Sequence, residues 1–298
     1  MKLICLEDEY KKNPDIKPQD IANLREWLKT QPHLPENYIT DLDLILVFHC
    51  CNCSTGFAKQ VLDLNLTLHS LFNIFKDRKV DGHMEQVVTN ILLTPLSMTT
   101  KEGYKIFFSH VMNSDLKVFN FGECVKAFLM TLEICQLQEG TWPGLLLVID
   151  FDRVSLGHFA KIDLYNLQQF LYYLQEAILV KLQGLHFINA PSFIDKLLMM
   201  MRPFMKKELM EMLHIHTVGS KTLEQFVPIE ALPKECGGNA MSLEEHTNEV
   251  ISRLRNYKDY FEQDKHRKVT ESLRPGKPKT ITDIFGGVEG SFKKLEID

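Results

Sequence analysis

Short apolar runs alternate with longer helical patterns through the middle of this chain, and this alternation limits its fold most. Apolar runs at residues 104–111, 145–149 and 184–188 have the length and the branched or aromatic side chains of buried strands. Apolar residues at helical spacing fill residues 121–137 and 163–178 between them. Strands that alternate with helices usually pair in parallel, with each helix crossing a face of the sheet. We therefore expect an α/β fold with a mostly parallel sheet.

The two ends of the chain differ from this middle region. Residues 1–76 carry helical spacing only, with Pro18 at the start of one amphipathic segment. Residues 77–84 are charged, contain Gly82 and are expected to link this part to the region of strands. Residues 242–298 read as one charged helix and an extended tail. We expect a small all-α module at 1–76, an α/β domain at 85–241, and a C-terminal helix and tail at 242–298. The tail is expected to lie outside the core.

Residues 183–209 combine a buried strand with a broad apolar helical surface. After the strand, Asn189 or Ser192 is expected to cap a helix at residues 193–201, and a second helical pattern covers 204–213. Four methionines lie between residues 199 and 205. Methionine-rich faces fill gaps in ordinary cores, but they also adapt to ligands of varied shape. The pattern therefore leaves two interpretations open, a filled core or a movable flap over an apolar ligand.

Composition excludes some classes of protein. The chain has 45% hydrophobic and 24% charged residues, which is typical of a globular protein with a sizeable core. A net charge of -5 argues against a nucleic-acid-binding protein. The sequence lacks an apolar run long enough to cross a bilayer and a convincing secretory signal. We read its seven cysteines as reduced thiols and expect a cytoplasmic protein.

No familiar catalytic or phosphate-binding motif occurs in the sequence. Asp150 and Asp152 end a predicted strand, where paired carboxylates either perform acid–base chemistry or orient a loop, aided by Arg153. No nucleophile accompanies them, so we favour the structural role. We expect no catalytic residues and no cofactor.

Two groups of residues contain potential metal ligands. His49, Cys50, Cys51 and Cys53 lie close in sequence, but a structural zinc site normally has a second pair of ligands further on. We interpret this group as helix packing. His214 and His216 alternate along a predicted strand at 214–218 and would share one face, yet two histidines do not complete a metal site. His186, in an apolar strand, is interpreted as a hydrogen-bonded core residue. We expect no metal site.

Several motifs resemble those of one lipid-binding family. They are LLLVIDFDRVSLGHF at residues 145–159, FVPIEALPKECGG at 226–238, and, between them, Gly184, His186, Ile188, Asn189, Pro191, Pro203 and Phe204. In this order they resemble the CRAL-TRIO family, which binds and transfers lipids such as tocopherol, retinoids and phosphoinositides. The chain resembles tocopherol-transfer-like and retinaldehyde-binding-like members of insect type. Its residues 290–298 resemble the tail of the insect members. Cys236 stands where tyrosine is usual.

The resemblance implies a helical N-terminal module beside a closed lipid cavity, with a gate at about residues 193–213. It favours the flap interpretation, although each wall residue could instead be filled core. Thr131, Ser155 and Tyr173 are candidates for orienting a polar group of the ligand. The candidate ligand-binding residues are Ala127, Phe128, Thr131, Leu145, Leu147, Ile149, Phe170, Tyr173, Leu174, Ile178, Val180, Leu182, Leu185, Ile194, Leu197, Leu198, Met201 and Phe204.

Members of this family that bind phosphoinositide headgroups carry a basic cleft. Here Lys181 remains, whereas Cys50 and Cys51 replace typical arginines. A multiply charged phosphate needs several cations, so strong phosphoinositide binding is not expected. Lys181, Lys206 and Lys207 are candidates for contact with anionic membrane lipids.

We therefore expect a non-enzymatic protein that moves a small hydrophobic ligand between membranes, such as a tocopherol, a retinoid or a similar isoprenoid. Its partners would be that lipid and a transient membrane surface, without nucleic acid. The first alternative is a phosphoinositide-binding signalling adaptor. The second is a hydrolase or isomerase that acts on a lipid.

Overall fold

The computed structural model describes residues 3–286, and its centre is a five-stranded sheet in the order β1-β2-β3-β4-β5. Strands β2 to β5 pair in parallel, and β1 pairs with β2 in the antiparallel sense. This confirms the expected α/β fold with a mostly parallel sheet. The strands are β1 (Ile91–Thr99), β2 (Lys105–Val111), β3 (Leu145–Asp150), β4 (Leu182–Ala190) and β5 (Leu213–Thr217).

The edge strand β1 and the helix before it, α5 (Gly82–Asn90), are missing from the sequence interpretation. Residues 77–84 were expected to be a link, but Asp81 accepts hydrogen bonds from the backbone N–H groups of His83 and Met84 and starts α5. Pro95 lies within β1, and a proline is tolerated there because an edge strand has a side with no ladder partner. The strand expected to be first, at 104–111, is therefore the second.

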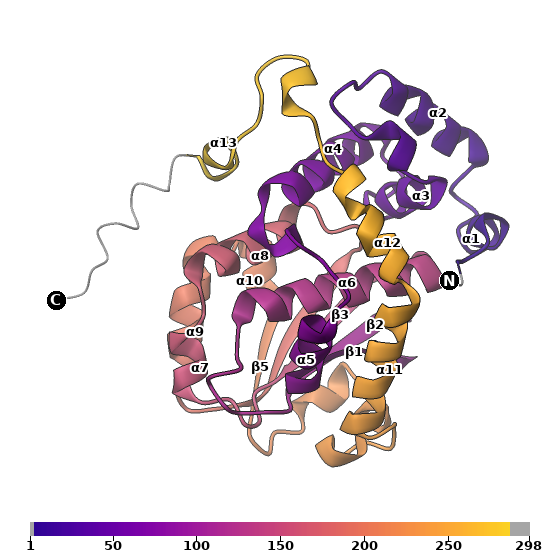
Figure 1. Cartoon of the computed structure of the whole chain (residues 1–298). Helices are drawn as coiled ribbons and strands as arrows, with labels where there is room; N and C mark the ends of the chain where they lie inside the picture. The colour runs from indigo at the N-terminus through magenta and orange to yellow at the C-terminus, as the bar shows by residue number, and fades with distance from the viewer. Residues whose placement is uncertain (1–2, 287–298) are drawn as a thin grey trace.

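Helix α6 (Phe121–Glu139) crosses the middle of the molecule, as Figure 1 shows. It contacts β1, α5 and α11 (Leu243–Asn256), and α8 (Leu164–Glu176) also packs on it. Most of its central residues are buried, including Ala127 and Met130, so α6 is a core helix rather than a surface helix. Strand β3 is buried on both of its faces, since Leu145 and Val148, which point to opposite faces, are both fully buried.

The N-terminal helices gather at one end of the molecule (Figure 1). Thr40 caps α3 (Asp41–Cys50), with its hydroxyl accepting from the backbone N–H of Asp43 at 3.2 Å. Helix α4 (Thr55–Leu71) joins two hydrophobic clusters, because Leu62 belongs to the smaller N-terminal cluster and Leu68 to the larger one. The other helices of this end are α1 (Leu6–Lys12) and α2 (Pro18–Lys29).

The C-terminal segment packs along the surface of the protein and enters the core at Phe285, so the expectation of a tail outside the core is wrong at that residue. The ring of Phe285 is 9% exposed and stacks on Phe72 at 5.5 Å. Arg274 bonds both carboxylate oxygens of Asp63 in α4 at 2.8 Å. The resemblance of residues 290–298 to insect tails lies outside the described residues. The remaining helices are α7 (Leu156–Ala160), α12 (Lys258–Gln263) and α13 (Ile281–Phe285).

Two short helices connect β4 to β5. They are α9 (Ile194–Met201) and α10 (Lys207–Glu211), joined by a 3-10 turn, η3 (Arg202–Phe204). The expected side-chain caps at their start are absent: residue 193 is the N-cap and makes no side-chain cap bond. Asn189 instead has φ 50° and donates its side-chain amide to Asp150 at 2.8 Å. Residues 191–212, which we call the gate segment, thus form the crossover between two neighbouring strands.

Candidate functional site

An apolar cavity of about 190 Å³ lies between the sheet, α6, α8 and α9. Strands β2 and β3 supply one wall, with residues such as Phe107 and Leu147. Helix α9 closes another side through Leu197 and Met201. Ligand pockets usually measure ~300–1,000 Å³, so a bulky lipid fits only if lining side chains move.

The structure places eight of the sequence-predicted ligand residues around this cavity. They come from α6, β3, α8, β4 and α9, which confirms only that these elements converge, not that they bind a lipid. The eight are Phe128, Leu147, Ile149, Phe170, Leu174, Leu185, Leu197 and Met201.

The other predicted ligand residues lie elsewhere. Thr131 donates its hydroxyl to the carbonyl of Ala127 within its own helix, at 2.8 Å. The hydroxyl of Tyr173 accepts from Asn65 of α4 at 3.2 Å, so it faces the N-terminal helices. Leu145, Ile194, Leu198 and Phe204 pack in or against the core outside the cavity lining, and Ile178, Val180 and Leu182 line a second pocket.

Polar residues on the cavity wall were missed by sequence reasoning. They are Ser109, Asp150 and His158. The predicted polar residue Ser155 is not among the lining residues, but its backbone N–H donates to Nδ1 of His158 at 3.0 Å. Nδ1 is therefore an acceptor, and in the neutral ring Nε2 carries the proton. Burial lowers the pKa of His158, which favours this neutral form. The Ser155–His158 spacing of a capping box was the available signal.

Comparison with known families gives two matches. Residues 92–238 match the CRAL/TRIO domain, and residues 13–84 match the Pinta-like UBA domain. Residues 92–238 form a CRAL/TRIO domain. This span runs from β1 to just past η6 (Lys234–Cys236), so it contains the gate segment and nearly all of the cavity lining.

Curated relatives are about a quarter identical to this chain over the aligned residues. It is similar to Clavesin-1 of Mus musculus, with 26% identity over 241 residues, covering 77% of this chain and 66% of the relative. Clavesin-2 of Homo sapiens is 25% identical over 238 residues, covering 77% of this chain and 71% of the relative. The chain thus spans about two thirds (66%) of the length of Clavesin-1.

Among solved structures, the crystal structure of Sfh5 is similar, with a TM-score of 0.46 and 11% identity. It covers 81% of this chain and 99% of that chain. Within residues 3–286 of the CRAL/TRIO chain, we find no helix with the length and apolar character needed to span a bilayer.

A second pocket, of about 370 Å³, opens between α3, α8 and the gate segment of the CRAL/TRIO chain. Its lining includes Lys181 and Lys206, together with Cys50 and Glu208. Lys206 is ion-paired with Glu176 of α8, and Lys207 outside the lining lies 3.6 Å from Glu211. Because the carboxylates offset these charges, the pocket presents little net positive charge to a phosphate.

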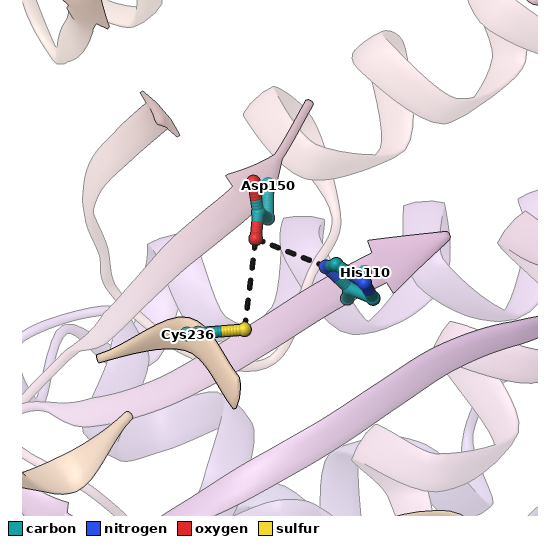
Figure 2. Close-up of side chains that lie close together, drawn as sticks. All are labelled: His110, Asp150 and Cys236. Carbon is teal, nitrogen blue, oxygen red and sulfur yellow. Dashed lines mark hydrogen bonds and ion pairs between the residues drawn. The ribbon is translucent and has the colours of Figure 1, made fainter. Parts of the chain in front are cut away.

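Asp150 is the centre of a polar cluster at the carboxyl ends of strands β2 and β3 (Figure 2). One oxygen, Oδ1, accepts from the Asn189 amide at 2.8 Å and from the backbone N–H of Asp152 at 2.9 Å. The other, Oδ2, lies 3.0 Å from Nδ1 of His110 and 3.8 Å from the thiol of Cys236. Burial alone would raise the pKa of Asp150, but these hydrogen bonds lower it. The expected loop-orienting role of Asp150 is met by its contact with the backbone N–H of Asp152. Arg153 lies 3.8 Å from the Asp152 carboxylate and donates to the carbonyl of Met112 at 3.2 Å.

The two groups of potential metal ligands noted in the sequence have other contacts. The Sγ atoms of Cys50 and Cys51 are 3.9 Å apart, and the Cys50 thiol donates a hydrogen bond to the carbonyl of Val47. His186 bonds His216 at 3.0 Å and stacks on His214, as a hydrogen-bonded core histidine should. In the described part of the chain, the one group of at least three clustered ligands is His110, Asp150 and Cys236.

Proposed function

We propose that this protein binds a small hydrophobic lipid in the apolar cavity and transfers it between membranes in the cytoplasm. The ligand class is a tocopherol, a retinoid or a similar isoprenoid, and the protein performs no catalysis. The observation that carries the proposal is an apolar cavity closed by a helix whose inner face is Leu197 and Met201. The functional division would follow residues 1–76, 85–241 and 242–298, with the first module bracing the lipid-binding domain.

Gate opening is the central step of the proposed mechanism. Helix α9 rests on the body of the protein through apolar side chains, and its exposed face carries Met199. At a membrane surface, the inner face meets lipid instead of water when the segment swings out, so opening costs less there than in solution. Polar contacts follow α9 at η3, where Gln175 of α8 donates to the carbonyl of Phe204 at 2.9 Å. In the proposed mechanism, η3 is the hinge and α9 is the part that moves.

The polar residues of the cavity support a ligand with one hydrogen-bond acceptor. Nε2 of His158 is buried and has no partner among the described residues. A buried N–H donor without a partner costs ~1–3 kcal/mol, which a hydroxyl or carbonyl oxygen of the ligand would recover. Selectivity would then come from cavity shape together with this one contact.

The phosphoinositide adaptor is a weaker candidate. Lys206 of the second pocket would have to lose its carboxylate partner Glu176 before binding a multiply charged headgroup. Binding to phosphoinositide vesicles at low salt, lost in Lys181→Ala, would favour the adaptor over our proposal.

Met201→Asp tests the cavity directly. Met201 is buried and lines the cavity, so a carboxylate there faces either the ligand or a costly apolar surface, and retention of bound all-trans-retinol should fall at least tenfold. Met199→Asp is the matched control, because Met199 lies two residues earlier in the same helix and is 68% exposed. Retinol fluorescence after gel filtration measures retention, and mass spectrometry of organic extracts identifies the natural ligand.

Equal retention in both variants would contradict a gate that touches ligand. Extracts without any stoichiometric hydrophobic molecule, together with no binding of retinol or tocopherol, would contradict the proposed function itself.

A further inference from the structure

His110, Asp150 and Cys236 offer three different kinds of metal ligand at the carboxyl ends of β2 and β3. His110 is in β2, Asp150 ends β3, and Cys236 comes from the 3-10 turn η6. One ligand atom from each lies within 4.8 Å of the others, and His110 and Asp150 are almost fully buried. Figure 2 shows the carboxylate between the imidazole and the thiol. We propose that these three side chains bind a divalent transition metal ion, with Zn²⁺ as the best fit.

The spacing of the ligand atoms is close to that of a tetrahedral site. Metal bonds of ~2.0 Å to nitrogen and oxygen and ~2.3 Å to sulfur place neighbouring ligands ~3.3 Å (N to O) and ~3.6 Å (S to O) apart. The corresponding distances here are 3.0 Å from His110 Nδ1 to Asp150 Oδ2 and 3.8 Å from Cys236 Sγ to the same oxygen. These two distances are within a few tenths of an ångström of the tetrahedral values, and all three ligand atoms lie within 4.8 Å of one another. Imidazole, carboxylate and thiolate are all zinc ligands.

The surroundings of Asp150 match those of a metal-binding carboxylate. Its Oδ1 is fixed by the Asn189 amide and the backbone N–H of Asp152, which leaves Oδ2 directed at the other two ligands. Outer hydrogen bonds of this kind orient metal ligands. Nε2 of His110 has no partner among the described residues, so no hydrogen bond at that atom fixes the ring.

Charge balance also favours a divalent ion. When the ion binds, the Cys236 thiol loses its proton to solvent and becomes a thiolate ligand. The proton that His110 directs from Nδ1 to Asp150 is then carried on Nε2, which frees Nδ1 for the metal while the ring stays neutral. Two negative ligands and one neutral imidazole then cancel the two positive charges, so the buried site is neutral overall. Three protein ligands leave a fourth position for water or another donor.

A nucleophilic role for the cysteine fits less well. The thiol contacts the carboxylate of Asp150, which is a weak base, and not the imidazole, so no imidazole is placed to take its proton.

Titration of the full chain with Co²⁺ tests the site, because a cobalt–thiolate bond gives a near-ultraviolet charge-transfer band. We expect one equivalent to bind with this band, and Cys236→Ser to abolish it. His110→Gln should weaken binding ~100-fold or more, since even outer-shell partners of metal ligands contribute ~10–100-fold. The double variant Cys50→Ser/Cys51→Ser is the matched control and should keep the band.

A second readout needs no variant. Zn²⁺ should protect Cys236 of the wild-type chain from alkylation, as measured by peptide mass spectrometry, and raise its melting temperature. A band that survives Cys236→Ser, a band lost in the double variant, or an unprotected Cys236 at saturating Zn²⁺ would each overturn the proposal. None of these measurements requires lipid, so their failure would leave the proposed lipid binding standing, and the reverse is also true.

Discussion

At the scale of single residues, His158 shows how one backbone amide can set the chemistry of a side chain. The N–H of Ser155 occupies Nδ1, which leaves the proton on Nε2 beside the cavity. Without that bond, the ring could present either an acceptor or a donor. If the cavity binds a lipid as proposed, a ligand that brings an oxygen to this wall would be preferred.

The change His158→Phe should therefore discriminate between ligands. Loss of one neutral hydrogen bond is worth ~1 kcal/mol, so affinity for retinol should fall about fivefold. Affinity for anhydroretinol, a hydrocarbon analogue without oxygen, should stay the same or rise. Fluorescence titration of both ligands measures the difference, and equal losses for the two would show that Nε2 makes no specific contact.

Some residues of this cavity could be predicted from the sequence, and others could not for a physical reason. Leu147, Leu197 and Met201 were predicted correctly as cavity-lining residues because strand alternation and helix periodicity define which side chains share a face. Periodicity does not say which of two buried faces meets a cavity. Leu145 and Tyr173 were therefore assigned to the ligand, although they pack against the core and the N-terminal helices.

At the scale of secondary-structure elements, β4 and β5 are joined by more than their ladder. His186 of β4 bonds His216 and stacks on His214, both of β5, and Phe226 packs on the same rings. His216 in turn lies 2.7 Å from the hydroxyl of Thr222. These contacts fix the two strands that flank the gate segment.

This histidine group should make folding sensitive to mild acid. Burial, and then the charges of His214 and His216, lower the pKa of His186 from 6.5 to about 3. The unfolded chain takes up a proton near pH 6.5 and the folded chain does not, so stability falls as the pH drops from 6.5 toward 3. The slope contributed by one such group reaches ~1.4 kcal/mol per pH unit.

Denaturant unfolding between pH 7 and pH 4 measures this slope. We expect His186→Phe to flatten it while leaving the unfolding cooperative. A slope unchanged by this substitution would mean that other groups dominate the acid response.

Sequence reasoning found the elements with strong patterns and missed those defined by local caps or by an edge position. The apolar run of β3 was identified because both of its faces are covered. Strand β1 was not, because Pro95 interrupts its pattern and its last three residues are exposed. Helices α5 and α7 are short, and their starts depend on single side chains such as Asp81.

At the scale of the whole molecule, the C-terminal segment ties the N-terminal helices to the rest of the chain. Arg274 is 6% exposed and bonds Asp63, Thr67 and Glu271. Phe285 then packs on Phe72 and Tyr172. The sequence did not predict this, since a charged segment rich in proline and glycine carries no periodic pattern to mark a buried residue.

Arg274→Ala should consequently destabilise the protein. It leaves the partly buried carboxylate of Asp63 with a weakened set of partners, and we expect a loss of ~3 kcal/mol, the low end for a broken buried pair, because Asp63 is 21% exposed. Arg255→Ala is the matched control: Arg255 pairs with Glu85 at 2.6 Å but is 64% exposed, so it should change little. Equal effects on the denaturation midpoint would show that the C-terminal segment does not brace the fold.

The position of residues 191–212 as a crossover has a consequence for repeated use. Both ends of the segment continue into paired strands of one sheet, so displacement of residues 191–211 would break no strand pairing and would leave the hydrogen bond from the Leu185 N–H to the Met212 carbonyl in place. In the proposed mechanism, β4 and β5 would keep their pairing register while the gate segment is displaced, so the register would not have to form again when the segment closes. Each round of loading and unloading would then be a local excursion that begins and ends at the same anchored points, without partial refolding between rounds.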